Sequence, residues 1–140
     1  MQSVQDYPEV EKAKTRVLVV EDDPSLCRLL ESFLRQESYQ VTSCHTAPEA
    51  VRHLQSKTFH LVLLDLALPP SNRVSEGLAL MEYCFQSAPH TKIVIISGEG
   101  TVDTAMACIR QGAEDYVVKP IDLEKLSVIF ERALQRQKLE

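Results

Sequence analysis

Polar side chains that can carry out chemistry stand at the ends of four short apolar runs. The runs are rich in Val, Ile or Leu and cover residues 16–20, 61–64, 92–96 and 115–118. The residues that follow them are, in chain order, Glu21 with Asp22, Asp65, Ser97 and Lys119. In an open parallel sheet, ligands bind in the crevice outside the carboxyl ends of the strands. We therefore expect three carboxylates, one hydroxyl and one ammonium group to meet at one edge of a sheet.

This set of groups is suited to phosphoryl chemistry. Mg²⁺ is a hard cation that binds a few carboxylates and shares its shell with phosphate oxygens, so Glu21, Asp22 and Asp65 could hold it. A carboxylate can also attack phosphorus, which would make Asp65 the carrier of an aspartyl-phosphate. The metal would neutralise the repulsion between the two anions. Lys119 is a compact point charge that suits a phosphoryl oxygen.

Each of these residues has a simpler interpretation when it is taken alone. An acidic residue after a strand often starts a turn, and Ser97 next to Gly98 could serve the same purpose. Asp23 precedes a proline, where a helix N-cap is expected. A lysine before Pro120 would by default be a surface residue. The joint occurrence at four strand ends favours the metal and phosphoryl interpretation, and a cis Lys119–Pro120 peptide could aim the lysine across the sheet edge.

Helical patterns alternate with the apolar runs. Helices are expected from Pro24, from a capping box at residues 46–49, from Gly77 to about Ala88, over residues 101–111 and from Asp122. Their expected buried stripes include Leu26, Leu29, Leu30, Phe33 and Leu34 in the first helix, and Val102, Ala105, Met106 and Ile109 in the fourth. The segment 39–44 is a less apolar strand, which we expect nearer an edge of the sheet.

The alternation of strand and helix five times over predicts βαβ units and a parallel sheet. Right-handed crossovers place helices on both faces of such a sheet. The fold class expected is therefore α/β, a three-layer sandwich with five parallel strands and five helices. Residues 1–14 are polar and aperiodic and are expected to form a flexible arm, and residues 15–140 form one domain.

Composition excludes several classes of protein. The 140 residues are 44% hydrophobic and 25% charged with a net charge of −5, and no Lys or Arg run indicates nucleic-acid binding. No stretch has the length of a membrane span, and the N-terminus lacks signal-peptide character. The four cysteines occur singly, without a C-x-x-C pair, and are expected to be reduced, buried thiols in a cytosolic protein.

Other catalytic motifs are absent from the sequence. The four histidines are scattered and form no ligand pair, so surface or packing roles are expected for them. Gly98 and Gly100 do not form a P-loop, because the G-x-x-x-x-G-K-[ST] pattern is missing. Ser97 has no G-x-S-x-G context, which argues against a serine hydrolase.

The sequence resembles receiver domains of two-component response regulators, over roughly Thr15 to Leu134. Residues 17–24 (VLVVEDDP) resemble the acidic segment of that family, and residues 63–69 (LLDLALP) resemble its phosphoacceptor segment. Residues 95–98 (IISG), 112–116 (GAEDY) and 119–120 (KP) resemble the segments that carry the switch hydroxyl, the switch aromatic residue and the site lysine. The five motifs occur in the family's order.

The resemblance implies a CheY-like, flavodoxin-like fold with strand order 2-1-3-4-5, and it assigns a role to each site residue. Asp65 would be the phosphoacceptor, assisted by Lys119 and Ser97. Mg²⁺ would bind Asp22, Asp65 and the backbone carbonyl of Ala67, and Glu21 would act through water.

The resemblance also implies a mechanism of signalling. A histidine kinase or phosphotransfer protein would donate the phosphoryl group, and the domain would signal rather than act as an enzyme on other substrates. Ser97 would then move toward the phosphoryl group and Tyr116 would rotate inward, which is a population shift. The surface of the fourth helix, fifth strand and fifth helix would change, and it could form a homodimer.

Two features distinguish this chain among receivers: the segment after the fourth strand and the length of the loop after Asp65. Residues 97–105 (SGEGTVDTA) and the long last helix are most similar to receivers of sigma-54-dependent activators, so a fused or a separate effector domain is expected.

Receivers usually place a glycine eight residues after the phosphoacceptor, whereas Gly77 follows Asp65 by twelve. Longer surface loops are tolerated, so the fold is unaffected. We expect the longer 66–76 loop to shield the phosphoryl group partly from water.

Two other functions are compatible with parts of the pattern. A Mg²⁺-dependent phosphohydrolase of the haloacid-dehalogenase kind would also form an aspartyl-phosphate, but it needs an acid two positions after the nucleophile, where this chain has Ala67. A degenerate receiver would bind partners without phosphorylation, and the retention of all the site residues argues against it.

Overall fold

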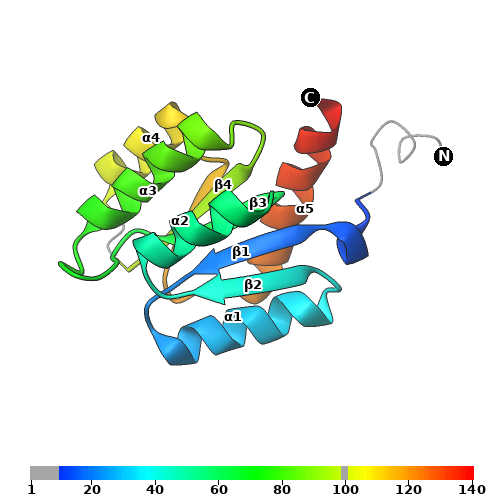
Figure 1. Cartoon of the computed structure of the whole chain (residues 1–140), viewed down its shortest axis with the longest axis horizontal. Helices are drawn as coiled ribbons and strands as arrows, with labels where there is room; N and C mark the ends of the chain where they lie inside the picture. Colours follow the sequence, from blue (N-terminus) through cyan, green and yellow to red (C-terminus); the bar gives the residue numbers. More distant parts are fainter. Residues whose placement is uncertain (1–9, 99–100) are drawn as a thin grey trace.

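Five parallel strands form a single sheet in the order β2-β1-β3-β4-β5, as expected from the sequence (Figure 1). The structure is a computed structural model, and it describes residues 10–98 and 101–140. The strands are β1 (Arg16–Val20), β2 (Gln40–Cys44), β3 (Leu61–Asp65), β4 (Lys92–Ser97) and β5 (Asp115–Val118). The helices are α1 (Pro24–Gln36), α2 (Ala47–Ser56), α3 (Val74–Ser87), α4 (Val102–Gln111) and α5 (Leu123–Leu139).

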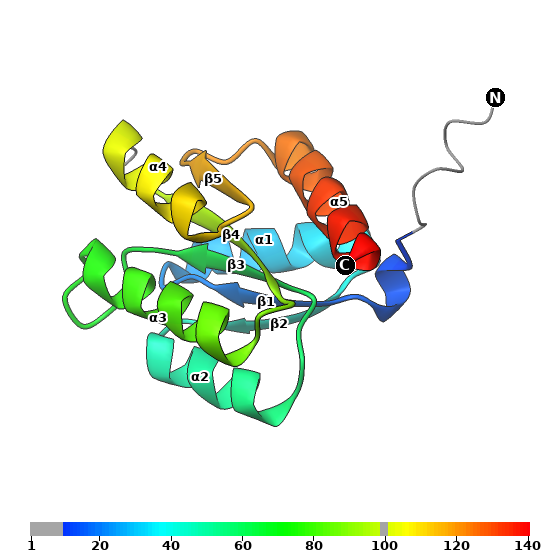
Figure 2. The same ribbon diagram turned by 90° about the horizontal axis from the view of Figure 1, so that it is seen from above.

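Helices cover both faces of the sheet, which completes the expected three-layer sandwich. Leu30 of α1 and Phe130 of α5 pack in one core cluster with alternate residues of the central strands. Ala50 of α2, Met81 of α3 and Cys108 of α4 pack in a second cluster on the opposite face. Figure 2 shows α2 and α3 on one side of the sheet and α1 and α5 on the other.

The apolar content of each strand matches its place in the sheet. Every residue of β3 is buried, as are all but the first residue of β1 and of β4, because helices cover these strands on both faces. The less apolar β2 lies at an edge, as expected, and β5 forms the other edge. The parallel register pairs Val20 with Leu64 and Asp65 with Ile96, so the carboxyl ends of these strands are level with one another.

Side-chain caps set the starts of several helices. Oδ1 of Asp23 accepts a hydrogen bond of 2.9 Å from the backbone N–H of Ser25, which confirms Asp23 as the N-cap of α1. Thr46 caps α2 by accepting from the N–H of Glu49, and Asp122 caps α5. These caps satisfy N–H groups that have no partner inside the helix.

The structure corrects the expected buried faces of α1 and α4. Leu29 of α1 is 52% exposed, and on α4 the side chains of Val102, Met106 and Ile109 are 72%, 45% and 43% exposed. Helix α4 packs against the edge strand β5 and is fully buried only at Cys108. Part of its apolar stripe therefore has no sheet beneath it. Helix α3 also begins at Val74, three residues before the expected start.

The segment directly before β1 contains a short helical turn and contacts two other parts of the chain. Residues 1–9 lie outside the described residues, but Lys12–Lys14 form a short 3-10 helix, η2. Nζ of Lys12 lies 2.8 Å from a carboxylate oxygen of Glu131 in α5 and 3.5 Å from one of Glu37 after α1. These ion pairs attach the segment before β1 to α5 and to the residue that follows α1.

The cysteines are as expected from their spacing. Cys27, Cys44, Cys84 and Cys108 are all buried free thiols. Burial raises the pKa of both Cys44 and Cys84 to about 12, which keeps these thiols protonated at neutral pH. None of the helices in the described parts of the chain is long and apolar enough to cross a bilayer.

Candidate functional site

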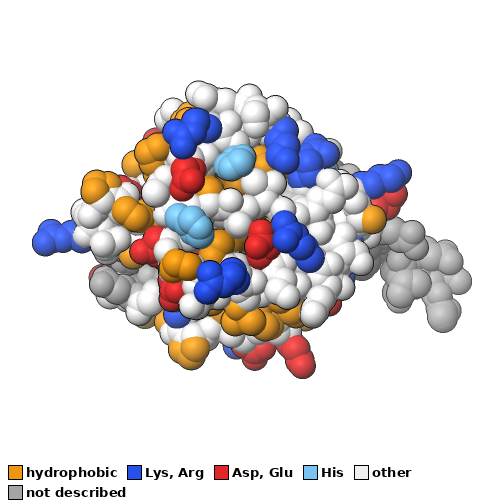
Figure 3. Space-filling view, turned by 60° about the horizontal axis from the view of Figure 1, so that its bottom comes forward, with side chains coloured by type: hydrophobic (Ala, Val, Ile, Leu, Met, Phe, Trp, Pro, Cys, Tyr) orange, Lys and Arg blue, Asp and Glu red, His pale blue; other side chains and the backbone are white. Residues whose placement is uncertain are grey.

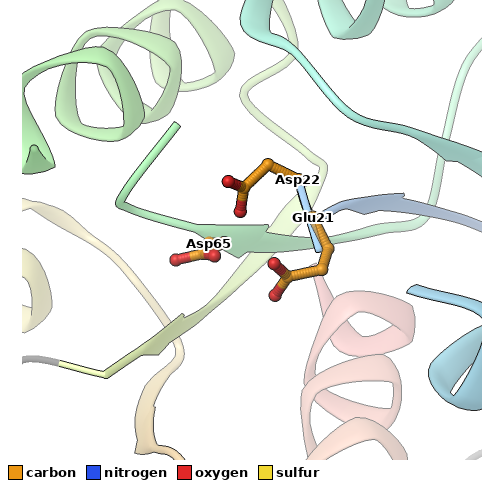
Figure 4. Close-up of side chains that lie close together, drawn as sticks. All are labelled: Glu21, Asp22 and Asp65. Atoms are coloured by element: carbon orange, nitrogen blue, oxygen red, sulfur yellow. The ribbon is translucent and has the colours of Figure 1, made fainter. Parts of the chain in front are cut away.

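Three carboxylates converge where β1 and β3 end. Glu21 and Asp22 directly follow β1, and Asp65 is the last residue of the neighbouring β3. One carboxylate oxygen from each lies within 4.8 Å of the other two. Figure 4 shows the three side chains gathered around the end of β3. The parallel register produces this arrangement, because Val20 pairs with Leu64 and the next residues are carried to the same edge.

Lys119 reaches this cluster from the end of β5. Its Nζ donates a hydrogen bond of 2.9 Å to Oδ2 of Asp65 and lies 3.0 Å from Oε1 of Glu21. The backbone N–H of Lys119 donates to the carbonyl of Ser97 at 2.9 Å, which fixes the end of β5 against β4. The Lys119–Pro120 peptide is cis, as the sequence suggested.

Burial and charge act together on these groups. Glu21 is fully buried and Asp65 is 1% exposed. Burial, reinforced by the neighbouring Asp65, raises the pKa of Glu21 to about 7. Burial lowers the pKa of Lys119, but hydrogen bonds and charge interactions with Asp65 and Glu21 outweigh it, so the pKa of Lys119 is raised overall. The ammonium group therefore remains charged and neutralises part of the acidic cluster.

The donor set fits a hard divalent cation. Three ionised carboxylates and one ammonium group would carry a formal charge of −2, which a divalent cation balances. Glu21 Oε1 is buried and, apart from its ion pair with Lys119, has no hydrogen-bond partner among the described residues. An oxygen with a single positive partner can accept a further positive ligand. All the ligand atoms are oxygens, the type that Mg²⁺ prefers.

The remaining expected site residues surround the same edge. The backbone N–H of Ala67 donates to Oδ1 of Asp65 at 3.1 Å, so the chain turns immediately beside the carboxylate. Ser97 is buried at the end of β4, one position beyond the residue that pairs with Asp65. A Cβ built on Gly98 would meet no atom of the described residues within 4 Å. Tyr116 in β5 is half-buried and packs against the core cluster of α2, α3 and α4.

The segment between Asp65 and α3 is ordered and folds back on itself. Leu66 and Leu68 are fully buried, Leu68 forms an antiparallel bridge with Arg73, and the N–H of Gly77 donates to the carbonyl of Leu66 at 3.1 Å. A Cβ at Gly77 would lie 2.2 Å from Cα of Leu66. This position therefore admits only glycine, and it holds α3 against the end of β3.

One contact to the site was not expected from the sequence. Nδ1 of His45 lies 2.8 Å from the backbone carbonyl of Glu21, so in the matching tautomer the ring donates a hydrogen bond to it. His45 was assigned only a surface or packing role, because no spacing pattern relates it to the acidic residues. The one signal was its position directly after β2, whose end lies beside that of β1.

Comparison with known proteins identifies relatives over most of the chain. The family model described as response regulator receiver domain matches residues 17–131. The nitrogen assimilation regulatory protein NtrX of Azorhizobium caulinodans is 33% identical over 123 residues, which is 88% of this chain and 27% of that protein. The transcriptional regulatory protein ZraR of Salmonella typhimurium is 32% identical, with the same coverage of 88% and 27%. The chain thus spans about a quarter of the length of these relatives.

Solved structures share the fold. A CheY-like receiver domain protein from Methanospirillum hungatei superposes with a TM-score of 0.82 at 26% identity, covering 89% of this chain and 97% of the other. The signal receiver domain of a LuxO repressor protein from Vibrio parahaemolyticus gives the same TM-score at 32% identity, covering 89% and 93%. The beryllofluoride-activated receiver domain dimer of NtrC4 gives 0.79 at 28% identity, covering 87% and 98%.

Proposed function

The chain belongs to the family of response regulator receiver domains, and on that premise we propose that it accepts a phosphoryl group on Asp65 in a Mg²⁺-dependent reaction. The observation that carries this proposal is the contact of Lys119 with Asp65 and Glu21 at the edge where Asp22 also lies. A buried nucleophilic carboxylate, a cation and two further carboxylates are the groups that this transfer requires.

The chain's own residues have separate tasks in this reaction. Mg²⁺ would be held by Asp22, Asp65 and the carbonyl of Ala67, and Glu21 would act through water. The ion would offset the repulsion between the Asp65 carboxylate and the incoming phosphoryl group. A carboxylate oxygen of Asp65 attacks the phosphorus of a phosphohistidine or a small acyl phosphate. The phosphorus–nitrogen or phosphorus–oxygen bond breaks, and the leaving atom takes the electron pair. Lys119 and Ser97 bind the oxygens of the transferred group.

The partners follow from this chemistry. The donor is a histidine kinase or a phosphotransfer protein. After transfer, Ser97 moves toward the phosphoryl group and Tyr116 turns further into the core, which changes the surface formed by α4, β5 and α5. That surface exposes apolar side chains that could pair with a second copy or an effector: Val102, Met106, Ile109, Val118 and Val128.

The effector that this domain controls lies outside the described fold. The longer relatives are named as regulatory proteins, and we infer that this domain controls an effector in the same chain or in another. A direct nucleic-acid contact is not part of the proposal. On the face shown in Figure 3, basic and acidic side chains are interspersed, without an extended basic patch.

The longer 66–76 loop is proposed to slow loss of the phosphoryl group by limiting the approach of water to Asp65. A variant that lacks the four residues 70–73 should lose the group faster. An unchanged rate of dephosphorylation would contradict this role.

The test of the function is the mass of the intact protein after incubation with acetyl phosphate and Mg²⁺. We expect addition of one phosphoryl group, and no addition in Asp65→Asn or with a chelator present. A native protein that gains no mass from acetyl phosphate or from a phosphorylated histidine kinase would contradict the proposal. The domain would then act as a binding module that is independent of phosphorylation.

A further inference from the structure

A cavity lies where the strands begin, at the end of the sheet opposite to the acidic cluster. The strands begin on the right in Figure 1. Its volume is about 640 Å³, within the range of small-molecule sites, about 300–1,000 Å³. The walls come from three parts of the chain: the segment before β1, the loops before β3 and β4, and the last turns of α5. None of the residues assigned to phosphoryl transfer lines it.

The floor of this cavity is apolar and its wall is fixed. Phe59 and Leu134 are buried in the two core clusters and contribute to the lining, together with the partly buried Leu54. Nε2 of Gln137 donates to the backbone carbonyls of His60 at 2.8 Å and His90 at 2.7 Å. These bonds tie the end of α5 to the loops before β3 and β4, so the cavity is formed in advance of binding.

The rim of the cavity is basic although the chain as a whole is acidic. Three lysines line the cavity against one carboxylate, whereas the net charge of the chain is −5. The carboxylate, Glu11, is paired with Lys14 at 3.3 Å. Lys57 and Lys138 have no carboxylate within 4.0 Å in the part of the chain that the structure describes. Nζ of Lys57 instead lies 5.4 Å from the centre of the Phe59 ring, next to the apolar floor.

A histidine adds a hydrogen-bond donor to this rim. Nδ1 of His60 accepts a 3.0 Å hydrogen bond from the backbone N–H of Arg16, so the neutral ring carries its proton on Nε2. Burial, and then the charges of Arg16 and Lys138, lower the pKa of His60. The lining thus combines apolar floor residues, an imidazole donor and two ammonium groups that have no carboxylate partner among the described residues.

We propose that this cavity binds a small organic acid whose carboxylate contacts Lys57 and Lys138 and whose apolar body lies on Phe59, Leu54 and Leu134. The contrast with another cavity supports the choice of an anion. That cavity, of about 710 Å³ between β5 and α5, is lined by Asp115, Asp122 and Glu124 against Lys125 and Arg132. It lacks the basic excess, and it does not favour a carboxylate.

The experiment uses three probes with the same apolar body and different heads: octanoate, octanol and octylammonium. Amide chemical shifts of the ¹⁵N-labelled protein are followed during titration of each probe. We expect saturable shifts with octanoate for the amides of residues 57–60, 87, 88, 90 and 91, weaker shifts with octanol and none with octylammonium. Asp65→Asn should behave like the unchanged protein, because the cavity is independent of the phosphoryl site.

Charge removal on the rim gives the decisive comparison. In the double variant Lys57→Gln/Lys138→Gln the dissociation constant for octanoate should rise about tenfold, since two charge-assisted contacts are lost. Both lysines are exposed, so the fold should persist. Lys125→Gln, in the other cavity, is the control and should leave the constant unchanged. Three outcomes would overturn the proposal: shifts with octylammonium as large as those with octanoate, shifts centred on residues 115–118, or no shifts at about 10 mM octanoate.

Discussion

The N–H of Gly77 donates to the carbonyl of Leu66, and at this contact a Cβ on Gly77 would lie 2.2 Å from Cα of Leu66. Leu66 directly follows Asp65, so the glycine lets α3 approach the strand that ends in the expected nucleophile. The glycine follows Asp65 by twelve residues, and this contact closes the loop between them.

We expect Gly77→Ala to lower the free energy of unfolding by about 2–4 kcal/mol, because backbone atoms rather than a flexible side chain must move. Urea denaturation followed by circular dichroism measures the change. Gly98→Ala is the matched control, since a Cβ there would meet no atom within 4 Å in the part of the chain that the structure describes. A loss of stability as large in Gly98→Ala as in Gly77→Ala would contradict the steric explanation.

The two neighbouring aspartates after β1 should differ in their effect on metal binding. Asp22 lies in the acidic cluster, whereas Asp23 caps α1. Asp22→Asn should weaken Mg²⁺ binding by about tenfold or more, because a charged ligand is lost. Asp23→Asn keeps an equally good N-cap and should change the affinity little. Calorimetric titration with Mg²⁺ measures both constants, and equal weakening would show that only net charge matters.

Removal of the Lys119 ammonium group should destabilise the protein, because the buried carboxylates would then repel each other. In a chelator, Lys119→Met should destabilise the protein by about 1–3 kcal/mol, because Glu21 and Asp65 lose their cation. Mg²⁺ should restore much of this loss. Lys125→Met, an exposed lysine on α5, should change nothing. Thermal unfolding with and without Mg²⁺ tests the prediction, and a stable Lys119→Met protein in the chelator would refute it.

The ion pair that attaches η2 predicts a pH-dependent contribution to stability. The hydrogen bond from Ser127 and the charge of Lys12 lower the pKa of Glu37 in the folded protein. A lowered folded-state pKa stabilises the protein above the unfolded value, about 4.3, and the stabilisation is lost as the pH falls through the folded-state pKa. Glu37→Gln should therefore cost up to about 1 kcal/mol at pH 7 and less near pH 4.

Urea denaturation of Glu37→Gln and the unchanged protein at a series of pH values provides the measurement. The double variant Glu37→Gln/Ser127→Ala serves as a control, since its effect should be smaller than the sum of the two single changes. A difference that stays constant down to pH 4 would show that the charge of Glu37 does not contribute.

The sheet and the convergence of the acidic residues were predictable because both depend on local signals. Continuous apolar runs give buried parallel strands, and the parallel register then brings Glu21, Asp22 and Asp65 to one edge whatever the sequence distance. The caps at Asp23 and Asp122 were predictable for the same reason, because a cap bonds to residues two or three positions away.

Features that depend on long-range packing were not predictable. The stripe on α4 has helical spacing, but spacing does not show whether a sheet lies beneath it, and Val102 proved to be exposed. The ion pair of Lys12 with Glu131 joins residues 119 positions apart, and no pattern in a polar segment indicates such a contact. The direct contact of Lys119 with Glu21 likewise appears only when the whole sheet is assembled.

Lys119 follows β5, the last strand in chain order. It contacts Glu21 and Asp65, which precede it by about a hundred and about fifty residues. During synthesis, a chain that has not yet placed β5 presents the acidic residues without their counter-charge. On the function proposed above, we expect an unfinished or misassembled copy, which lacks this cation, to accept no phosphoryl group. Correct assembly of the sheet would then be a condition for signalling.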